Sequence, residues 1–143
     1  MITEGYMPFM GYQTYYRIVG EASEKAPLLL LHGGPGSTHN YFEVLDCIAE
    51  TGRQIISYDQ IGCGHSYLDG HPELWTQKTW IDELIAIREH LHLDSVHLLG
   101  QSWGANGTCS ATRATHALSM PTRSIAKYSP TGWQRTTSSY SSV

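Results

Sequence analysis

The segment Gly100–Gly104 (GQSWG) places a serine between two glycines, each two residues away. It follows the short apolar run Ser95–Leu99, which is typical of a buried strand. A strand that enters a G-x-S-x-G turn and continues into a helix exposes the serine hydroxyl at the strand's carboxyl end. Ser102 is therefore a candidate nucleophile for attack on a carbonyl carbon. The pattern alone is weak, because an ordinary Gly/Ser loop has the same composition.

A second glycine-rich segment, His32–Gly36 (HGGPG), follows the wholly apolar run Pro27–Leu31. Attack by a serine builds negative charge on the carbonyl oxygen, and preorganised backbone N–H groups stabilise that charge. Glycines allow such N–H groups to face a cleft without side chains in the way. We expect the donors to be Gly34 and Trp103, the residue after the serine. A tight connection without a catalytic role is the alternative for this loop.

Apolar strands alternate with amphipathic helices along this part of the chain, which predicts an α/β fold with a mostly parallel, doubly wound sheet. The carboxyl ends of parallel strands lie at one edge, so the glycine loops at Gly33, Gly62 and Gly104 should gather there. We expect strands at 12–19, 27–31, 54–58 and 95–99, and helices at 39–50 and 77–92.

Apolar residues at helical spacing define one face of each expected helix. In the second helix, Asp82, Glu83 and Arg88 are expected on the opposite, solvated side. The apolar residues are Tyr41, Val44, Leu45 and Ile48 in the first helix, and Trp80, Leu84, Ile87 and Leu91 in the second.

Three segments together resemble the signatures of the proline iminopeptidases, which have the α/β-hydrolase fold. They are Leu31–Gly36, Tyr58–Ser66 (YDQIGCGHS) and Gly100–Gly104. The resemblance covers residues 1–104, about the N-terminal third of a family member. It implies Ser102 as the nucleophile and release of an N-terminal residue, often proline, from short peptides with a free N-terminus. It implies no cofactor.

Asp59 and His65, in the middle segment, do not form the main catalytic triad in our interpretation. In this fold the acid and the histidine follow the serine in the chain. We expect Asp59 to brace its turn through backbone hydrogen bonds and His65 to be a surface side chain. No metal site is expected, since His90, His92 and His97 share no face.

Composition excludes several other classes. The net charge of −4 argues against nucleic acid as a partner, and no apolar run is long enough to span a bilayer. The N-terminus lacks the features of a secretory signal, so we expect a cytoplasmic protein. Cys47, Cys63 and Cys109 are odd in number and widely spaced, which indicates free thiols.

The character of the sequence changes directly after the serine motif. All thirteen acidic residues lie between Glu4 and Asp94, whereas fifteen of the thirty-nine residues in 105–143 are Ser or Thr. We therefore divide the chain into 1–104, the N-terminal part of a hydrolase domain, and 105–143, an aberrant tail of disordered composition. Our hypothesis is that the tail is translated from a shifted reading frame. A genuine short variant with a divergent tail is the alternative.

This change removes the residues that would activate Ser102. His116 is the only histidine after it, and no Asp or Glu follows to orient that histidine. We expect a serine aminopeptidase by sequence that is inactive as this chain. The alternatives are an esterase or amidase on the same fold, and a truncated product without function or a binding module.

Overall fold

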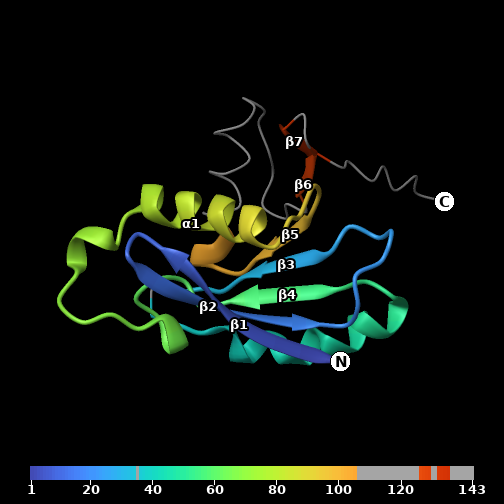
Figure 1. Cartoon of the computed structure of the whole chain (residues 1–143), viewed down its shortest axis with the longest axis horizontal. Coiled ribbons are helices and arrows are strands. Elements are labelled where there is room, and N and C mark those ends of the chain that lie inside the picture. The colour runs from blue at the N-terminus through green and yellow to red at the C-terminus, as the bar shows by residue number, and fades with distance from the viewer. Residues whose placement is uncertain (35, 106–125, 130–131, 136–143) are drawn as a thin grey trace.

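A computed structural model describes residues 1–34, 36–105, 126–129 and 132–135 of the chain. The described residues form a sheet with the strand order β1-β2-β4-β3-β5-β6-β7 (Figure 1). The strands are β1 (Ile2–Phe9), β2 (Tyr12–Val19), β3 (Leu28–Leu31), β4 (Ile55–Tyr58), β5 (His97–Gly100), β6 (Ala126–Ser129) and β7 (Gly132–Arg135).

Parallel pairing is confined to the centre of this sheet. β3 pairs in parallel with β4 on one side and with β5 on the other. The outer pairs β1–β2, β2–β4, β5–β6 and β6–β7 are antiparallel. The predicted α/β class is thus confirmed, and the sheet is mixed, with its parallel part at the strands that carry the glycine loops.

The first strand, β1, was not expected from the sequence. Its residues are mostly exposed, and only Met7 is buried, so the strand carries little apolar signal. Its partner strand supplies the stability, because all eight residues of β1 pair with β2. The two-residue hairpin loop, Met10 and Gly11, has positive φ at both positions (49° and 84°), as a type I′ turn requires.

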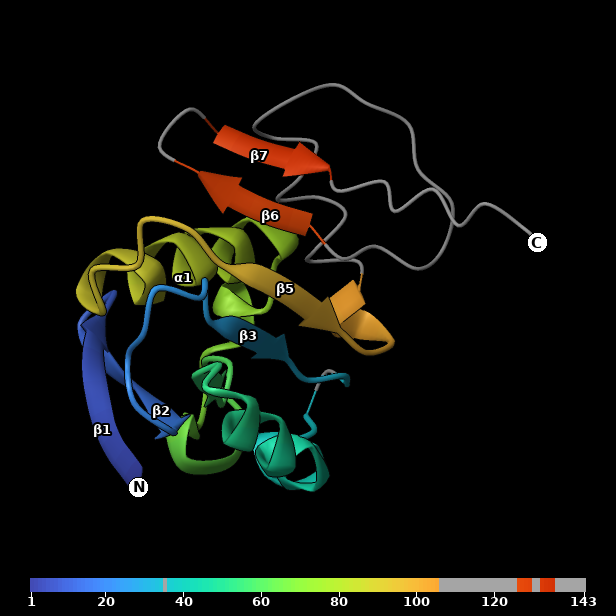
Figure 2. The ribbon, with the colours of Figure 1, turned by 90° about the vertical axis from the view of Figure 1, so that its right-hand side faces the viewer.

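Helices cover both faces of the sheet (Figure 2). On one face, α1 (Gln77–His90) packs Leu84 and Ile87 against Leu29 and Leu31 of β3. On the other face, the 3₁₀ helix η1 (His39–Thr51) packs Phe42 against Leu30. Successive leucines of β3 therefore enter opposite cores, which is why this strand is apolar throughout.

The buried face of η1 agrees with the predicted one at Leu45 and Ile48 and differs from it at Val44, which is 78% exposed. The apolar residues of η1 in or against the core are Phe42, Leu45, Ile48 and Ala49. A 3₁₀ helix has three residues per turn, so positions three apart share a face, whereas the prediction used the α-helical period. The helix ends at Gly52, whose φ is 76°.

The expected apolar face of α1 is largely confirmed, but its opposite side is less solvated than expected, since the Arg88 side chain is only 16% exposed. Trp80, Leu84 and Ile87 are buried, and Thr76 caps the N-terminus by accepting a hydrogen bond from the Thr79 N–H at 3.2 Å. Glu83, which we expected in solvent, is fully buried. Its carboxyl group accepts hydrogen bonds from the Thr14 hydroxyl (2.5 Å) and the Ile61 N–H (2.9 Å), partners distant in sequence.

Most of the predicted tail, 105–143, lies outside the described residues. Within it, β6 and β7 form an antiparallel pair that joins the sheet beside β5. No helix in the described ranges is long and apolar enough to cross a bilayer. Cys47 is exposed, Cys63 is buried, and both are free thiols, as expected; Cys109 is outside the described residues.

Candidate active site

Three glycine-containing loops meet at the carboxyl edge of the parallel strands, as the sequence predicted. Residues 32–36 follow β3, residues 59–66 follow β4, and residues 101–104 follow β5. Contact between the first and third loops is close: a Cβ added at Gly33 would lie 3.3 Å from Ser102 Cβ and 3.1 Å from the Gln101 carbonyl oxygen. A side chain at this position would require the Gln101 side chain to move, because the new Cβ would overlap its Oε1, and the two loops to separate by a few tenths of an ångström.

Ser102 lies at the turn between β5 and a helical segment that begins at Trp103. Its φ is 52°, in the left-handed region that costs a non-glycine residue about 1–2 kcal/mol. Hydrogen bonds from the Gly104 N–H to the Gln101 carbonyl (2.9 Å) and from the Ala105 N–H to the Ser102 carbonyl (3.0 Å) hold the turn. The serine is exposed at the carboxyl end of its strand.

Gly104 explains why the turn needs glycine after the serine. A Cβ at this position would overlap the Leu31 carbonyl oxygen and lie 2.7 Å from the Leu31 carbonyl carbon. These are backbone atoms of β3, which cannot move without disturbing the centre of the sheet. The neighbouring Trp103 packs edge-on against Trp80 of α1, with ring centroids 4.9 Å apart.

A hydrogen-bond chain joins the loop after β3 to the residue before the serine. The Gly33 N–H donates to the Tyr41 hydroxyl at 2.6 Å, and that hydroxyl donates to Gln101 Oε1 at 3.1 Å. The Gly33 N–H is therefore engaged within the protein. Gly34, the next residue, is exposed and has a φ of 132°, which favours glycine.

His32 fixes the loop after β3 to the loop after β4. Its Nε2 accepts the Gln60 N–H at 2.9 Å, so the ring proton is on Nδ1, which lies 2.7 Å from the Gly33 carbonyl oxygen. The Gln60 side chain in turn donates to the His32 carbonyl at 2.8 Å. Burial lowers the pKa of His32 and outweighs the opposing hydrogen bond to Gly33, which keeps the ring neutral.

Asp59 braces its turn through backbone hydrogen bonds, as the sequence indicated. It accepts the N–H groups of His39 (2.8 Å) and His65 (2.9 Å), one on each carboxylate oxygen. The side chains of both histidines also contact it, which the sequence did not reveal. Burial acts to raise the pKa of Asp59, but the hydrogen bonds from His39 and His65 prevail and lower it to about 2.

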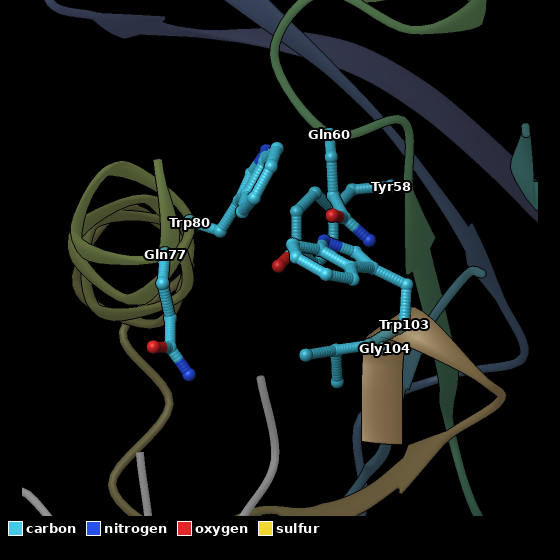
Figure 3. A pocket seen from close by; sticks show the side chains of 7 residues that line it. Tyr58, Gln60, Gln77, Trp80, Trp103 and Gly104 are labelled. Carbon is cyan, nitrogen blue, oxygen red and sulfur yellow. The ribbon is translucent and has the colours of Figure 1, made fainter. Parts of the chain in front are cut away.

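A small pocket lies between α1 and the turn that carries the serine (Figure 3). Its volume is about 20 Å³, close to the space that one water molecule needs. The residues around it are Leu31, Tyr58, Gln60, Gln77, Trp80, Trp103 and Gly104. A pocket of this size has no room for a peptide.

Known proteins with similar sequences have the α/β-hydrolase fold, in agreement with the geometry of this site. The family model described as "alpha/beta hydrolase fold" matches residues 26–118. Proline iminopeptidases of Clostridioides difficile (strain 630) and Lactobacillus helveticus are 74% and 70% identical over 104 and 105 residues, or 72% of this chain. The chain spans about 36% of the length of these curated relatives.

Solved structures agree with this similarity. A crystal structure of proline iminopeptidase from Mycobacterium smegmatis superimposes with a TM-score of 0.70 at 37% identity, covering 78% of this chain and 40% of that one. Epoxide hydrolase A from Mycobacterium thermoresistibile, at 19% identity and a TM-score of 0.68, shares the fold over 78% of this chain and 35% of its own.

Proposed function

The chain belongs to the α/β-hydrolase fold family, and from this premise we propose that Ser102 is the nucleophile of a serine aminopeptidase. The observation that carries the proposal is the strained turn of Ser102 (φ 52°) against the glycine loop after β3. The strain orients the hydroxyl away from the strand, where a bound carbonyl can reach it. The substrate class is short peptides with a free N-terminus, often proline, as the similarity to proline iminopeptidases suggests.

We assign the oxyanion donors to the N–H groups of Gly34 and Trp103. Trp103 is the first helical residue after the serine, where the N–H groups of a helix have no partner within the helix. The Gly33 N–H is engaged by Tyr41, which leaves Gly34 as the donor in its loop. Each such donor contributes about 2.7–4 kcal/mol to stabilising the transition state.

Attack requires a base that takes the Ser102 proton as the Oγ–carbon bond forms. The sequence after Ser102 has one histidine, His116, and no carboxylate to orient it. We propose that this 143-residue chain by itself does not turn over substrate. Binding and oxyanion stabilisation alone leave roughly 10³–10⁴-fold acceleration over water, far below a complete site.

The first experiment treats the purified chain with a fluorophosphonate probe, with Ser102→Ala as the control. We expect no labelling of either protein. Stoichiometric labelling that is lost in Ser102→Ala would overturn the proposed inactivity and would show that another residue acts as the base.

The gene sequence tests the proposed origin of residues 105–143. We expect the alternative reading frame after codon 104 to encode a hydrolase-like helix and a downstream Asp and His. If it encodes neither, the shifted-frame hypothesis is wrong, and a divergent short variant takes its place.

The frame-restored protein then tests the substrate class. We expect it to cleave a proline arylamide in preference to a short-chain ester, and Ser102→Ala to abolish both reactions. Faster turnover of the ester would instead favour the alternative function, an esterase or amidase, because the serine turn identifies a nucleophile and not a substrate.

A further inference from the structure

One cluster of ligand-bearing side chains has no part in the proposed reaction. His39, Asp59 and His65 each place a nitrogen or oxygen ligand atom within 4.8 Å of the others. His39 Nδ1 is 2.8 Å from Asp59 Oδ1, and His65 Nδ1 is 3.1 Å from Asp59 Oδ2. We call these three residues the His–Asp–His cluster.

We propose that the His–Asp–His cluster binds one divalent transition-metal ion of the Zn²⁺ or Co²⁺ type. In the tetrahedral geometry that Zn²⁺ prefers, ligands about 2.1 Å from the metal lie about 3.4 Å apart. The two nitrogen–oxygen separations in the cluster, 2.8 and 3.1 Å, are a few tenths of an ångström shorter than that edge. An ion between the two rings and the carboxylate thus needs only small side-chain shifts.

The donor set selects the class of metal. Two imidazoles and one carboxylate suit Zn²⁺, Co²⁺ and Ni²⁺, whereas Mg²⁺ and Ca²⁺ prefer ligand sets made of oxygen. An imidazole that carries its single proton on Nε2 presents the Nδ1 lone pair to a metal ion.

The backbone already holds the three ligands in place. His39 begins η1, Asp59 follows β4, and His65 lies in η2 (Gly64–Ser66). The N–H groups of both histidines fix the carboxylate, at 2.8 and 2.9 Å. Tyr15 packs against both rings, with centroids 5.2 Å from His39 and 4.5 Å from His65. A preformed site loses little conformational entropy when the ion binds.

The exposure of the ligands defines how an ion enters. The His39 and Asp59 side chains are 3% and 0% exposed, whereas that of His65 is 56% exposed. The ion therefore arrives from the His65 side, and water fills its remaining coordination positions there, as in sites with three protein ligands.

The test uses the tag-free, 143-residue chain after dialysis against a chelator. Zn²⁺ binding is measured by calorimetry, and Co²⁺ binding by its visible absorption. We expect one ion per chain, and His65→Asn should weaken the affinity at least about tenfold. His71→Asn is the matched control, because it removes another histidine paired with a carboxylate, Glu73 at 2.9 Å, and should leave the affinity unchanged.

Two further measurements test whether the ion is held by the cluster and not by side chains elsewhere in the chain. A double variant, Cys109→Ser and His116→Asn, should retain the affinity, since neither residue belongs to the cluster. In the unaltered chain, ¹⁵N NMR of the imidazoles should show Zn²⁺ on the Nδ1 atoms of two histidines, which does not depend on any variant folding correctly. Equal affinity in His65→Asn, loss in the double variant, or no binding of millimolar Co²⁺ each overturns the proposal.

Discussion

Replacing Glu83 with glutamine removes a carboxyl group whose proton is retained in the folded state. Burial raises the pKa of Glu83 to about 8, against the lowering effect of hydrogen bonds from Thr14 and Ile61. In the unfolded chain the group has its ordinary pKa of 4.5. Below pH 4.5 both states are protonated, and the contribution of Glu83 to stability is complete. As the pH rises to 8, the unfolded state loses its proton first, so this contribution is lost.

The size of the effect follows from the shift. At about 1.4 kcal/mol for each pKa unit, the full window from pH 4.5 to 8 corresponds to about 5 kcal/mol. Between pH 5 and pH 7 the loss is about 2–3 kcal/mol. A glutamine at this position keeps an oxygen to accept the Ile61 N–H and does not titrate, so Glu83→Gln should lose this pH dependence.

The assay is equilibrium unfolding in urea at several pH values from 5 to 8, followed by circular dichroism. We expect the difference in unfolding free energy between Glu83→Gln and the parent chain to grow by about 2–3 kcal/mol in favour of the variant from pH 5 to pH 7. Asp82→Asn, at the next position of α1 with a side chain 44% exposed, is the matched control and should keep the parent's slope. If the unfolding free energies of Glu83→Gln and the parent changed with pH in parallel, the reasoning would be refuted, because the Glu83 carboxyl would then be ionised in the folded state.

Three further substitutions test single contacts of the fold by urea unfolding. Gly104→Ala should destabilise the chain by at least about 1–3 kcal/mol, because the new Cβ overlaps the backbone of β3. Gly70→Ala should cost less, because its Cβ meets nothing within 4 Å and only the positive φ of 76° opposes the alanine; equal costs would contradict this. Tyr41→Phe should cost about 1–3 kcal/mol by leaving the buried Gly33 N–H without its acceptor, and Tyr67→Phe, at an exposed tyrosine, almost nothing; no difference between them would argue against the hydrogen-bond chain. Asp46→Asn should cost about 1–3 kcal/mol of unfolding free energy, because it breaks the bidentate ion pair with the buried Arg17 (3.0 and 2.7 Å). A loss below about 0.5 kcal/mol, similar to that of an exposed pair, would mean that this ion pair contributes little.

The sequence by itself determined the features that depend on local sterics. The turn at Ser102 requires glycine at position 104, so the serine turn could be predicted without coordinates. The apolar run Leu28–Leu31 must be covered on both faces, so the central strand could be predicted as well. The positions of the three glycine loops followed, because parallel strands end at one edge. The three short motifs also carried the resemblance to proline iminopeptidases, which the similarity to known proteins supports.

Only the tertiary structure decided which polar groups are buried together. Glu83 shares its helix with solvated charges, and its burial depends on Thr14, sixty-nine residues away. His39 and His65 are twenty and six residues from Asp59, on separate elements, and no periodicity connects them. The register of η1 was likewise set by packing on β3. Burial and hydrogen bonding are properties of residues brought together by the fold, so their energies and pKa values were not contained in any local pattern of Gly100–Gly104 or of the chain around it.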